Sequence, residues 1–485
     1  MNLENLLQQY APSPGIWDEL HDGHAIRPHY AQALARLGPL DIAALQQKEK
    51  MAGELFMNQG ITFTVYSDNT GIERIFPFDI IPRIITALEW GHIEQGIQQR
   101  LRALNLFLKD IYSNQQIIKD GIIPAGLIAS CPHYTREVFG IAVPYDIYVH
   151  ISGIDLIRGD NGTFYVLEDN LRTPSGVSYM LENREITKRI FPDLFQNNPV
   201  RQVSNYPVLL HQILTSLAPG GAAHPTVVLL TPGIFNSAYY EHTFLARHMG
   251  IPLVEGRDLV IENHKVYMKT TSGLKRVDVI YRRVDDEFLD PLVFRRNSLL
   301  GIPGLVSAYR KGNVAIVNAA GTGVADDKAV YAYVPDMIRY YLNEEARLPN
   351  VPTYQLADEE HRKYVFDNIA TMVIKQTNQS GGYGMIMGNR LEEEAWEEAK
   401  KKITEDARHY IAQPIINLST VPCFIDGELQ PRHVDLRPYA LCGPQGVQIV
   451  PGGLTRVALN AGSLVVNSSQ GGGSKDTLII DENHN

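Results

Sequence analysis

The sequence predicts a mixed α/β protein, and three stretches carry this prediction. Residues 150–176 have the pattern of a β-hairpin, in which two short strands flank the turn Gly159-Asp160-Asn161-Gly162. Residues 226–254 read as a strand, a helix and a second strand, which is typical of half a Rossmann-type unit. Residues 372–387 read as two strands joined by a glycine-rich loop. The 485 residues are expected to form about two to four domains.

The composition excludes several classes of protein. A hydrophobic content of 44% and a charged content of 20% are ordinary for a soluble globular chain, and the net charge of −10 argues against a nucleic-acid or polybasic membrane surface. No uncharged apolar run reaches the roughly 18 residues of a membrane span, and the first residues lack the basic region of a secretory signal. The scattered Cys131, Cys423 and Cys442 predict neither a disulfide framework nor a zinc site. We therefore expect a cytoplasmic protein, and a homo-oligomer is left open.

The elements before the hairpin are mainly helical. Residues 1–75 are a mixed N-terminal segment, with a helix expected at 42–60 and a strand at 60–65. Residues 79–112 show apolar positions at helical spacing, among them Leu101, Leu104 and Phe107. The simplest role for this long helix is packing.

The hairpin carries the first candidate site. Asp155 lies on its first strand, and Glu168 and Asn170 share one face at the end of the second, because side chains two apart point the same way. Carboxylates and an amide oxygen that converge in this way suit Mg²⁺ with phosphate oxygens in the remaining positions. Arg172 follows as a phosphate-directed cation, and Pro174-Ser175-Gly176 offers backbone N–H groups on a tight turn. The alternative is a surface hairpin with solvated acids.

The next unit begins after a stretch rich in Pro, Gly and Ala at residues 216–225. Buried strands are expected at 226–230, 252–254, 277–281 and 313–318, with a helix at 239–249. No GxGxxG follows the first strand, so NAD binding is a poor interpretation. Two charged segments, residues 282–286 and Asp326-Asp327-Lys328, come after strands of this unit.

The glycine-rich loop carries the second candidate site. The strand at 372–375 ends in Lys375, and the loop that follows contains Gly381, Gly382, Tyr383 and Gly384. Such a loop lets backbone N–H groups approach phosphates, although it is not a Walker A motif, and an ordinary hairpin is the alternative.

The last part of the chain continues with alternating elements. We expect a charged helix at 391–408 and strands at 410–416 and 433–437, the last of which places Asp435 and Arg437 on one face. An Asp–Arg surface pair is the alternative to a phosphate contact for Arg437. Residues 467–476 read as a second Gly/Ser loop with Lys475, for which a disordered linker is the alternative.

Together these pieces resemble the ATP-grasp ligases, and more closely the circularly permuted ATP-grasp type 2 family. The strings VLEDNLRTPSG, YRRVDDEFLDP, GVADDKAVYAY and HVDLRPYAL carry the resemblance, which spans nearly the whole chain. It implies Mg²⁺ ligands at Asp155, Glu168 and Asn170, and a nucleotide held by Lys328, Lys375 and the loop residues Gly381, Gly382, Tyr383 and Gly384. It also implies catalytic roles for Arg172, Lys375 and Arg437. One position departs from the pattern: Gln413 occupies the place where ordinary ATP-grasp enzymes often have a Glu that binds the ribose or the adenine edge.

The order of the motifs implies circular permutation, since the metal hairpin usually comes last and here comes first. The expected domains are an N-terminal segment, 1–75; helices with the metal hairpin, 76–215; a Rossmann-like pre-ATP-grasp domain, 216–325; an ATP-grasp small lobe, 326–430; and a return to the large lobe with a tail, 431–485. One site must then form from residues about 300 positions apart in the sequence.

The resemblance implies an ATP- and Mg²⁺-dependent carbon–nitrogen ligase that joins a carboxylate to an amine through an acyl phosphate and releases ADP and phosphate. Two alternatives remain: a nucleotide-binding scaffold without turnover, and a kinase that stops at a phosphorylated product. The partners expected are a small-molecule or peptide acid and amine, which the sequence does not name. Their selection is expected to involve residues 179–184, 282–286 and 467–476.

Overall fold

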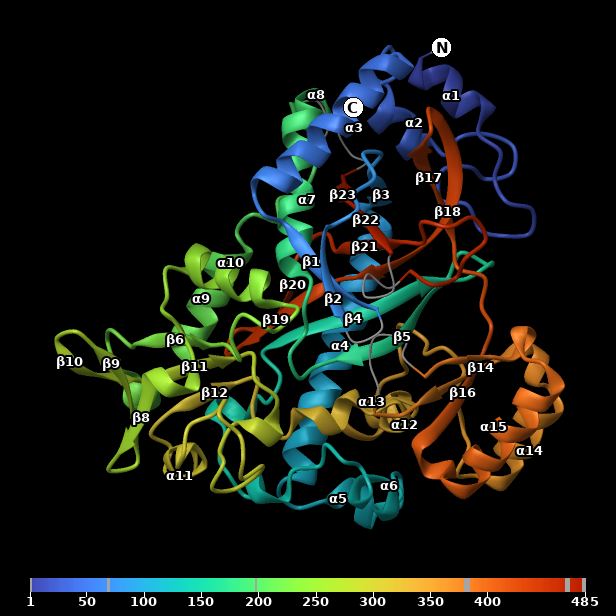
Figure 1. The fold of residues 1–485 in the computed structure, drawn as a ribbon. Coiled ribbons are helices and arrows are strands. Elements are labelled where there is room, and N and C mark those ends of the chain that lie inside the picture. Colours follow the sequence, from blue (N-terminus) through green and yellow to red (C-terminus); the bar gives the residue numbers. More distant parts are fainter. Residues whose placement is uncertain (1, 68–69, 197–198, 379–383, 467–471, 482–485) are drawn as a thin grey trace.

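The computed structural model describes residues 2–67, 70–196, 199–378, 384–466 and 472–481, and an eight-stranded sheet lies at its centre (Figure 1). The sheet joins parts of the chain that are far apart in the sequence, because β4 (Ile151–Arg158) lies between β19 (Tyr439–Gly443) and β18 (Glu428–Arg437) and pairs with both. The strands run in the order β20 (Gly446–Ile449), β19 (Tyr439–Gly443), β4 (Ile151–Arg158), β18 (Glu428–Arg437), β21 (Leu454–Val457) and β22 (Gly473–Lys475), with β5 (Phe164–Asn170) on β4 and β17 (Thr420–Ile425) on β18.

A long helix, α4 (Ala87–Ile111), packs against this sheet and runs through the hydrophobic core. The sequence pattern predicted that the helix begins at residue 79, which is wrong. It begins at Ala87 because Thr86 and Glu89 form a capping box, in which each side chain accepts from the other residue's backbone N–H. The residues before it form β3 (Arg83–Thr86), which pairs in parallel with β23 (Thr477–Ile480).

The Rossmann-like unit lies on one side of the central sheet (Figure 1, green and yellow). Its parallel strands run in the order β12 (Ala315–Val317), β11 (Val279–Arg282), β6 (Val227–Leu230) and β7 (Leu253–Val254). Each predicted strand of this unit is therefore confirmed; three are shorter than predicted, and β11 begins and ends later than the predicted 277–281. Helices α9 (Tyr206–Ser216), α10 (Tyr239–Met249) and α11 (Leu305–Arg310) accompany the sheet, and β8 (Leu259–Glu262), β9 (Lys265–Thr270) and β10 (Gly273–Val277) form a small separate sheet. The carboxyl ends of parallel strands are where such sheets bind ligands.

A separate lobe lies on the other side (Figure 1, orange), and it has its own hydrophobic cluster. Its antiparallel strands run in the order β13 (Tyr354–Gln355), β16 (Tyr410–Pro414), β14 (Met372–Gln376) and β15 (Ile386–Met387). Helices α14 (Glu359–Asp367) and α15 (Glu393–Glu405) cover it. The charged helix predicted at 391–408 thus exists but is shorter, because η9 (Ala407–His409) follows it.

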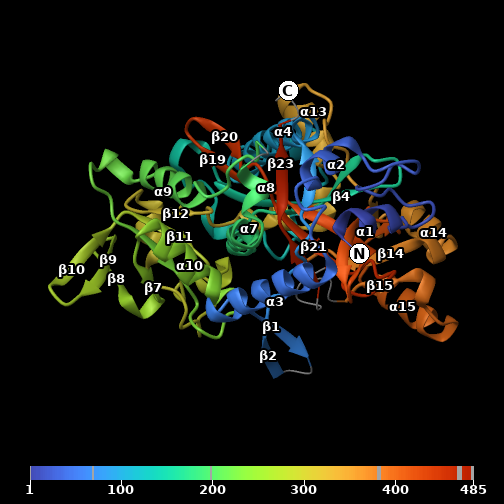
Figure 2. The same ribbon diagram turned by 90° about the horizontal axis from the view of Figure 1, so that it is seen from above.

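Short helices complete the molecule. They are α1 (Leu3–Gln9), α2 (Pro28–Leu34), α5 (Gln116–Lys119), α6 (Ala125–Ala129), α8 (Pro192–Gln196), α12 (Lys328–Tyr331) and α13 (Val334–Leu342). Longer helices α3 (Ile42–Asn58) and α7 (Val177–Ile190) lie side by side, and the hairpin β1 (Thr62–Ser67) and β2 (Thr70–Ile75) follows α3 (Figure 2). In the described part of the chain, no helix is both long enough and apolar enough to cross a bilayer.

The end of the predicted Gly/Ser loop is ordered sheet. Residues 473–475 form β22, which pairs with β21, and Lys475 is buried with its ammonium 2.9 Å from an Asp79 carboxylate oxygen. The linker interpretation is therefore wrong for these three residues, because a paired strand and a buried ion pair hold them. Residues 467–471 and 482–485 lie outside the described part.

Candidate active site

The hairpin β4–β5 places the three oxygen side chains on neighbouring positions, as the sequence pattern predicted. Asp155 is directly opposite Glu168, and Gly153 is opposite Asn170, with a register shift after Asp155. Glu168 keeps 22% of its side chain exposed, whereas Asp155 is fully buried. The side-chain nitrogen of Asn170 is buried and has no hydrogen-bond partner among the described residues. The side-chain nitrogen of Asn170 is therefore uncommitted beside an accessible carboxylate.

The carboxylate of Asp155 accepts hydrogen bonds from two guanidinium groups. Its Oδ1 accepts from Arg437 Nε at 2.5 Å, and its Oδ2 accepts from Arg437 Nη2 at 2.7 Å and from Arg456 Nη2 at 2.8 Å. Burial alone would raise the pKa of Asp155, but Arg437 and Arg456 outweigh it and hold that pKa well below its usual range. In this arrangement the carboxylate of Asp155 positions Arg437. For Asp155 to act as a metal ligand, its hydrogen bonds with Arg437 and Arg456 would have to rearrange.

Two lysines approach the hairpin from other segments. Lys328, at the start of α12, lies with its Nζ 3.4 Å from Glu168 Oε2. Lys375, on β14, is close enough to Glu168, Lys328 and Asp155 for their charges to act on it. Burial lowers the pKa of Lys375 to about 8, with Lys328 lowering it further and the two carboxylates opposing the change. The structure thus brings Glu168, Lys328 and Lys375 together, as the motif order predicted.

Gln413 lies beside Lys375 rather than free for a ligand. Its Oε1 accepts from Lys375 Nζ at 2.7 Å, and its Nε2 donates to Thr353 Oγ1 at 3.0 Å. Next to this pair is a cavity of about 140 Å³. Its walls come from the hairpin, from β14 and from the segment after β16, and include Ile157, Leu167, Val351, Val373, Met387, Ile415 and Ile416. An apolar slot of this size suits one flat ring, since whole ligands usually need about 300 Å³ or more.

The turn Pro174-Ser175-Gly176 is held rigidly from three sides. Arg437 Nη1 and Tyr439 Oη donate to the Ser175 carbonyl at 3.1 and 3.0 Å. Arg283, just after β11, donates to the Pro174 carbonyl at 2.6 Å, and Glu241 of α10 accepts from the backbone N–H of Gly176 at 2.7 Å. Gly176 has a φ of +110°, which other residues rarely adopt. The Rossmann-like unit therefore fixes the turn that follows the hairpin.

Arg172 lies among acidic side chains. Its Nε is 3.5 Å from Asp285 Oδ1 and 3.6 Å from Asp326 Oδ2, and its Nη1 is 3.5 Å from a ring nitrogen of His133. Burial raises the pKa of Asp326 to about 7, although Arg172 opposes this. Within the described residues, no hydrogen bond or ion pair joins Arg172 to Glu168, Lys375 or Arg437. Its catalytic role remains a prediction.

The glycine-rich loop is only partly described. Gly381, Gly382 and Tyr383 lie outside the described residues, and Gly384 follows them with a φ of +68°. A positive φ at this position is accessible to glycine without strain. The role of this loop at the phosphates remains a prediction.

Three further residues hold the site together and were missed by the sequence analysis. Arg456 pairs with both Asp155 and Asp435, Glu241 anchors Gly176, and the amide of Asn318 bonds the backbone of Ile151 and Leu171 at 2.9 and 2.7 Å. Two of them carry a sequence signal. Arg456 is a charge inside an apolar strand, and Asn318 is a polar residue directly after one. Glu241 carries none.

The donor set fits Mg²⁺ in part. Glu168 and Asn170 supply one carboxylate and one amide oxygen, which matches a cation that takes its other ligands from phosphates and water. Among the described residues, no group of three or more His, Cys, Asp or Glu side chains could hold a metal by protein ligands alone. A metal held by Glu168 and Asn170 would take its remaining ligands from water or phosphate.

Comparison with known proteins places these motifs in a family. The model described as circularly permuted ATP-grasp type 2 matches residues 82–458. A Synechocystis protein described as uncharacterized is 53% identical over 475 residues, which are 98% of both chains. A Frankia casuarinae protein, provisionally named a glutamate–cysteine ligase, is 41% identical over 478 residues. That match covers 98% of this chain but only 54% of the Frankia protein, so its name describes a much longer chain.

A solved structure supports the fold. The glutathione synthetase-like effector of Globodera pallida, in its apo form, matches with a TM-score of 0.60, covering 90% of this chain and 98% of that chain. The sequences are 12% identical, so the likeness concerns the fold alone. With the matched family model, it identifies the mixed helix and sheet architecture as an ATP-grasp fold in permuted order.

Proposed function

The chain belongs to the circularly permuted ATP-grasp type 2 family, and from this we propose that it is an ATP- and Mg²⁺-dependent ligase that joins a carboxylate to an amine. One observation carries the proposal. Glu168, Lys328, Lys375 and Arg437 come from four separate segments and meet around the β4–β5 hairpin. Phosphoryl transfer needs this combination of cations around one carboxylate, because catalysis there is mainly positioning and charge stabilisation.

The nucleotide would lie between the small lobe and the hairpin. Its base would fill the apolar cavity of about 140 Å³ beside Gln413, with its phosphates toward Lys375 and Lys328. Glu168 and Asn170 would hold Mg²⁺, which neutralises charge on the phosphates when it is bound. Gly381, Gly382, Tyr383 and Gly384 would cover the phosphates and exclude water.

The residues of the chain then account for two chemical steps. A substrate carboxylate oxygen attacks the γ-phosphorus, the bond from that phosphorus to the β–γ bridging oxygen breaks, and ADP leaves. Arg437, held by Asp155, stabilises charge on the transferred group. A neutral amine then attacks the acyl carbon of the acyl phosphate, phosphate leaves, and the proton of the amine passes to solvent. Arg172 would face the substrates, because it lies between the end of β5 at Asn170 and the turn Pro174-Ser175-Gly176.

The acid and the amine are proposed only as classes, namely small molecules or peptides. Homologues named as ligases, such as the Frankia protein, are consistent with an amide product. A cytoplasmic location is also part of the proposal, because Cys131, Cys423 and Cys442 are all unpaired.

The test is the identity of the nucleotide product. Purified chain is incubated with Mg²⁺, ATP and mixtures of acids and amines, and nucleotides are separated by chromatography. ADP and phosphate should appear in proportion to an amide, and only when both an acid and an amine are present. AMP as the stoichiometric product would overturn the mechanism. ADP formation with an acid alone, yielding a stable phosphorylated product, would indicate a kinase, and binding of ATP without turnover would indicate a scaffold.

A further inference from the structure

A groove outside the site described above lies between four helices. It is formed by the end of α3 together with α7, α9 and α10, and has a volume of about 910 Å³. We call it the α7–α10 groove, and the two helices after which it is named contact each other (Figures 1 and 2). Its charged or hydrogen-bonding side chains include Glu182, Glu185 and Arg189 of α7, Tyr240, Thr243, Arg247 and His248 of α10, and Asn58, Gln59 and Ser204.

The groove holds opposite charges that do not pair directly. Glu182 accepts a long hydrogen bond of 3.4 Å from Tyr240 Oη. The amide of Gln59, in the orientation that satisfies both neighbours, lies between Glu182 and Arg189 at 2.8 and 2.9 Å and keeps them apart. In the part of the chain that the structure describes, neither Arg189 nor Arg247 forms an ion pair. A carboxylate and two guanidinium groups therefore face one space.

The environment of Glu182 favours a bound cation. Burial raises the pKa of Glu182, with Glu185 raising it further, while Tyr240, Arg189 and Arg247 oppose the change without cancelling it. Glu185 is already used, because it pairs with Lys188 at 2.8 Å. A ligand ammonium group at Glu182 would favour the charged form of the carboxylate, because a nearby opposite charge stabilises it.

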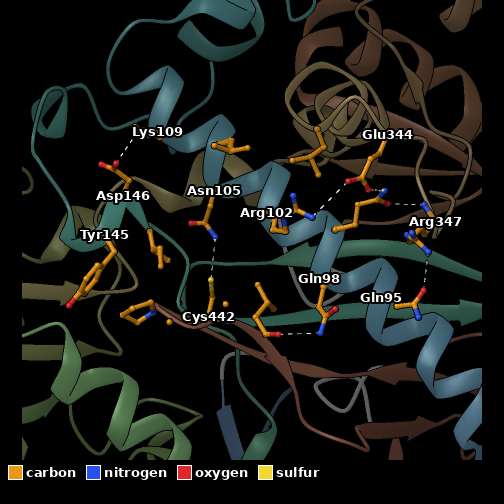
Figure 3. A pocket seen from close by; sticks show the side chains of 18 residues that line it. Gln95, Gln98, Arg102, Asn105, Lys109, Tyr145, Asp146, Glu344, Arg347 and Cys442 are labelled. Atoms are coloured by element: carbon orange, nitrogen blue, oxygen red, sulfur yellow. Dashed lines mark hydrogen bonds and ion pairs between the residues drawn. The ribbon is translucent and has the colours of Figure 1, made fainter.

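A second groove offers a contrast. It lies along α4 and has a volume of about 660 Å³ (Figure 3). There Lys109 pairs with Asp146 at 2.8 Å, Arg102 lies 3.9 Å from Glu344, and Arg347 donates to Gln95 at 2.9 Å. Lys109, Arg102 and Arg347 each interact with another residue of the protein, so the observations that favour a ligand in the α7–α10 groove do not apply to this one.

We infer that the α7–α10 groove binds a zwitterionic ligand, an amino acid or a short peptide, with its ammonium group at Glu182 and its carboxylate at Arg189 and Arg247. Such a ligand carries one positive and one negative group. The groove offers the carboxylate of Glu182 and the guanidinium groups of Arg189 and Arg247, and the neutral amide of Gln59 separates Glu182 from Arg189. Guanidinium groups bind carboxylates well. The volume lies within the range of small-molecule sites, about 300–1,000 Å³. Peptide-like molecules also belong to the substrate classes proposed above, but the inference does not depend on that reaction.

The groove is linked to the catalytic candidate through neighbouring residues of α10 and through less than two turns of α7. Tyr240 lines the groove, and the next residue, Glu241, holds the backbone of Gly176 at the end of the hairpin. Along α7, the six residues from Gly176 to Glu182 correspond to about 9 Å, given a rise of about 1.5 Å per residue. The groove therefore lies beside the turn that Arg437 and Arg283 also hold.

Binding can be measured without ATP. The whole chain is mixed with random tripeptides that have free termini, or with the same mixture acetylated and amidated, and retained peptides are identified by ultrafiltration and mass spectrometry. Free peptides should be retained and blocked peptides should not. Glu182→Gln and Arg247→Gln should each weaken retention at least tenfold, because each removes one half of the charge match.

Arg102→Gln in the α4 groove is the matched control, since it removes an arginine of similar exposure without touching Glu182. It should leave retention unchanged, and circular dichroism should show that all variants remain folded. Equal retention of blocked peptides, no retention of any peptide, or an equal effect of Arg102→Gln would overturn the inference. Since ATP is absent, none of these results bears on the ligase proposal.

Discussion

Asp155 and Glu168 are opposite each other in the same hairpin, yet their surroundings give them different tasks. Asp155 is fully buried and bound by Arg437 and Arg456, whereas Glu168 is partly exposed and faces Lys328. Removing one partner of a buried ion pair usually costs about 3–5 kcal/mol of stability. A variant of Asp155 would therefore confound folding with catalysis, and Glu168 is the better probe of the metal.

Glu168→Gln is expected to lower the rate of Mg²⁺-dependent ADP formation by about 100-fold or more, the scale on which loss of one charge-stabilising group acts. The amide keeps the size of the side chain but removes the charge that Mg²⁺ requires. The measurement is steady-state ADP release, with a thermal melt to show that the fold is kept. Turnover equal to that of the parent protein would reject Glu168 as a metal ligand.

Lys375 gives a prediction about pH. Its pKa of about 8 lies below the ordinary 10.5, so the free protein loses this cation as the pH rises through 8. Only the protonated amine attracts phosphate, and kcat/KM reports ionisations of the free enzyme. We therefore expect that the ionisation of Lys375 leaves kcat/KM for ATP unchanged below pH 8. Above pH 8 it should lower kcat/KM about tenfold per pH unit.

Lys375→Arg is the matched variant, because a guanidinium stays charged throughout this range. Its profile should lose the fall near pH 8, whatever its absolute rate. An identical fall in the Arg variant would assign the ionisation to another group.

At the scale of elements, the side chain of Arg437 on β18 lies against Gly153 on β4, which has no side chain of its own. A Cβ at Gly153 would lie 3.0 Å from Arg437 Cδ, so Gly153→Ala should shift this side chain by a few tenths of an ångström. A misplacement of 1 Å near the reacting atoms can cost about 100-fold in rate, so a shift of a few tenths of an ångström should have a smaller but measurable effect. We expect kcat to fall about tenfold with little change in the KM for ATP.

The control for this variant is Gly53→Ala in α3, where a Cβ would meet nothing within 4 Å. It should leave kcat unchanged and stabilise the chain by up to about 1 kcal/mol, because alanine is the better helix former. A Gly153→Ala protein with the parent kcat would show that the position of Arg437 does not limit the reaction.

The lobe that carries Lys375 is fastened to the rest of the molecule by Arg408 of η9. This side chain donates to the Leu127 carbonyl at 2.9 Å and to Ser130 Oγ at 2.8 Å, and it lies 3.2 Å from Asp327, which caps the helix that begins with Lys328. Arg408→Ala should therefore raise the KM for ATP about tenfold, because Lys328 and the lobe that carries Lys375 lose a common anchor. Initial rates at varied ATP measure this.

Arg339→Ala provides the comparison, since Arg339 is 53% exposed and pairs only with nearby Asp336 and Glu345 among the described residues. Exposed pairs contribute about 0–1 kcal/mol, so its KM should not change. If both variants raise the KM equally, the anchoring role of Arg408 is wrong.

The elements that the sequence predicted are those with local signals. The hairpin has its turn residues, the Lys375 strand ends at a glycine-rich loop, and the Rossmann-like strands are continuous apolar runs. Element ends were less predictable where a distant partner decides them. Residues 473–475 resemble a flexible linker until β21 pairs with them and Asp79 neutralises Lys475.

At the scale of the whole molecule, the sequence named several residues that lie together in the candidate site, but not all their partners. The family motifs led to Glu168, Lys328, Lys375 and Arg437, which do converge. The contact of Arg456 with Asp155 joins residues 301 positions apart, and that of Arg283 with Pro174 joins residues 109 apart. No local pattern specifies such pairs, because the first depends on how strands from distant parts of the chain assemble into one sheet and the second on how the Rossmann-like unit packs beside that sheet.

A site built from distant segments predicts how the molecule responds to a nucleotide. Mg²⁺-ADP would contact the small lobe, the hairpin and the region of Lys328 together, so binding should stabilise all of them as one unit. At a free concentration about 100 times Kd, the expected gain is about 2.7 kcal/mol, which should raise Tm by a few degrees. Calorimetry of the whole chain should show the entire transition moving to higher temperature.

Among variants, Lys375→Met should abolish this shift in Tm, whereas Arg339→Ala should keep it. A melt in which only one part of the transition moves would mean that the nucleotide binds a single lobe, and the assembled site proposed here would then be wrong.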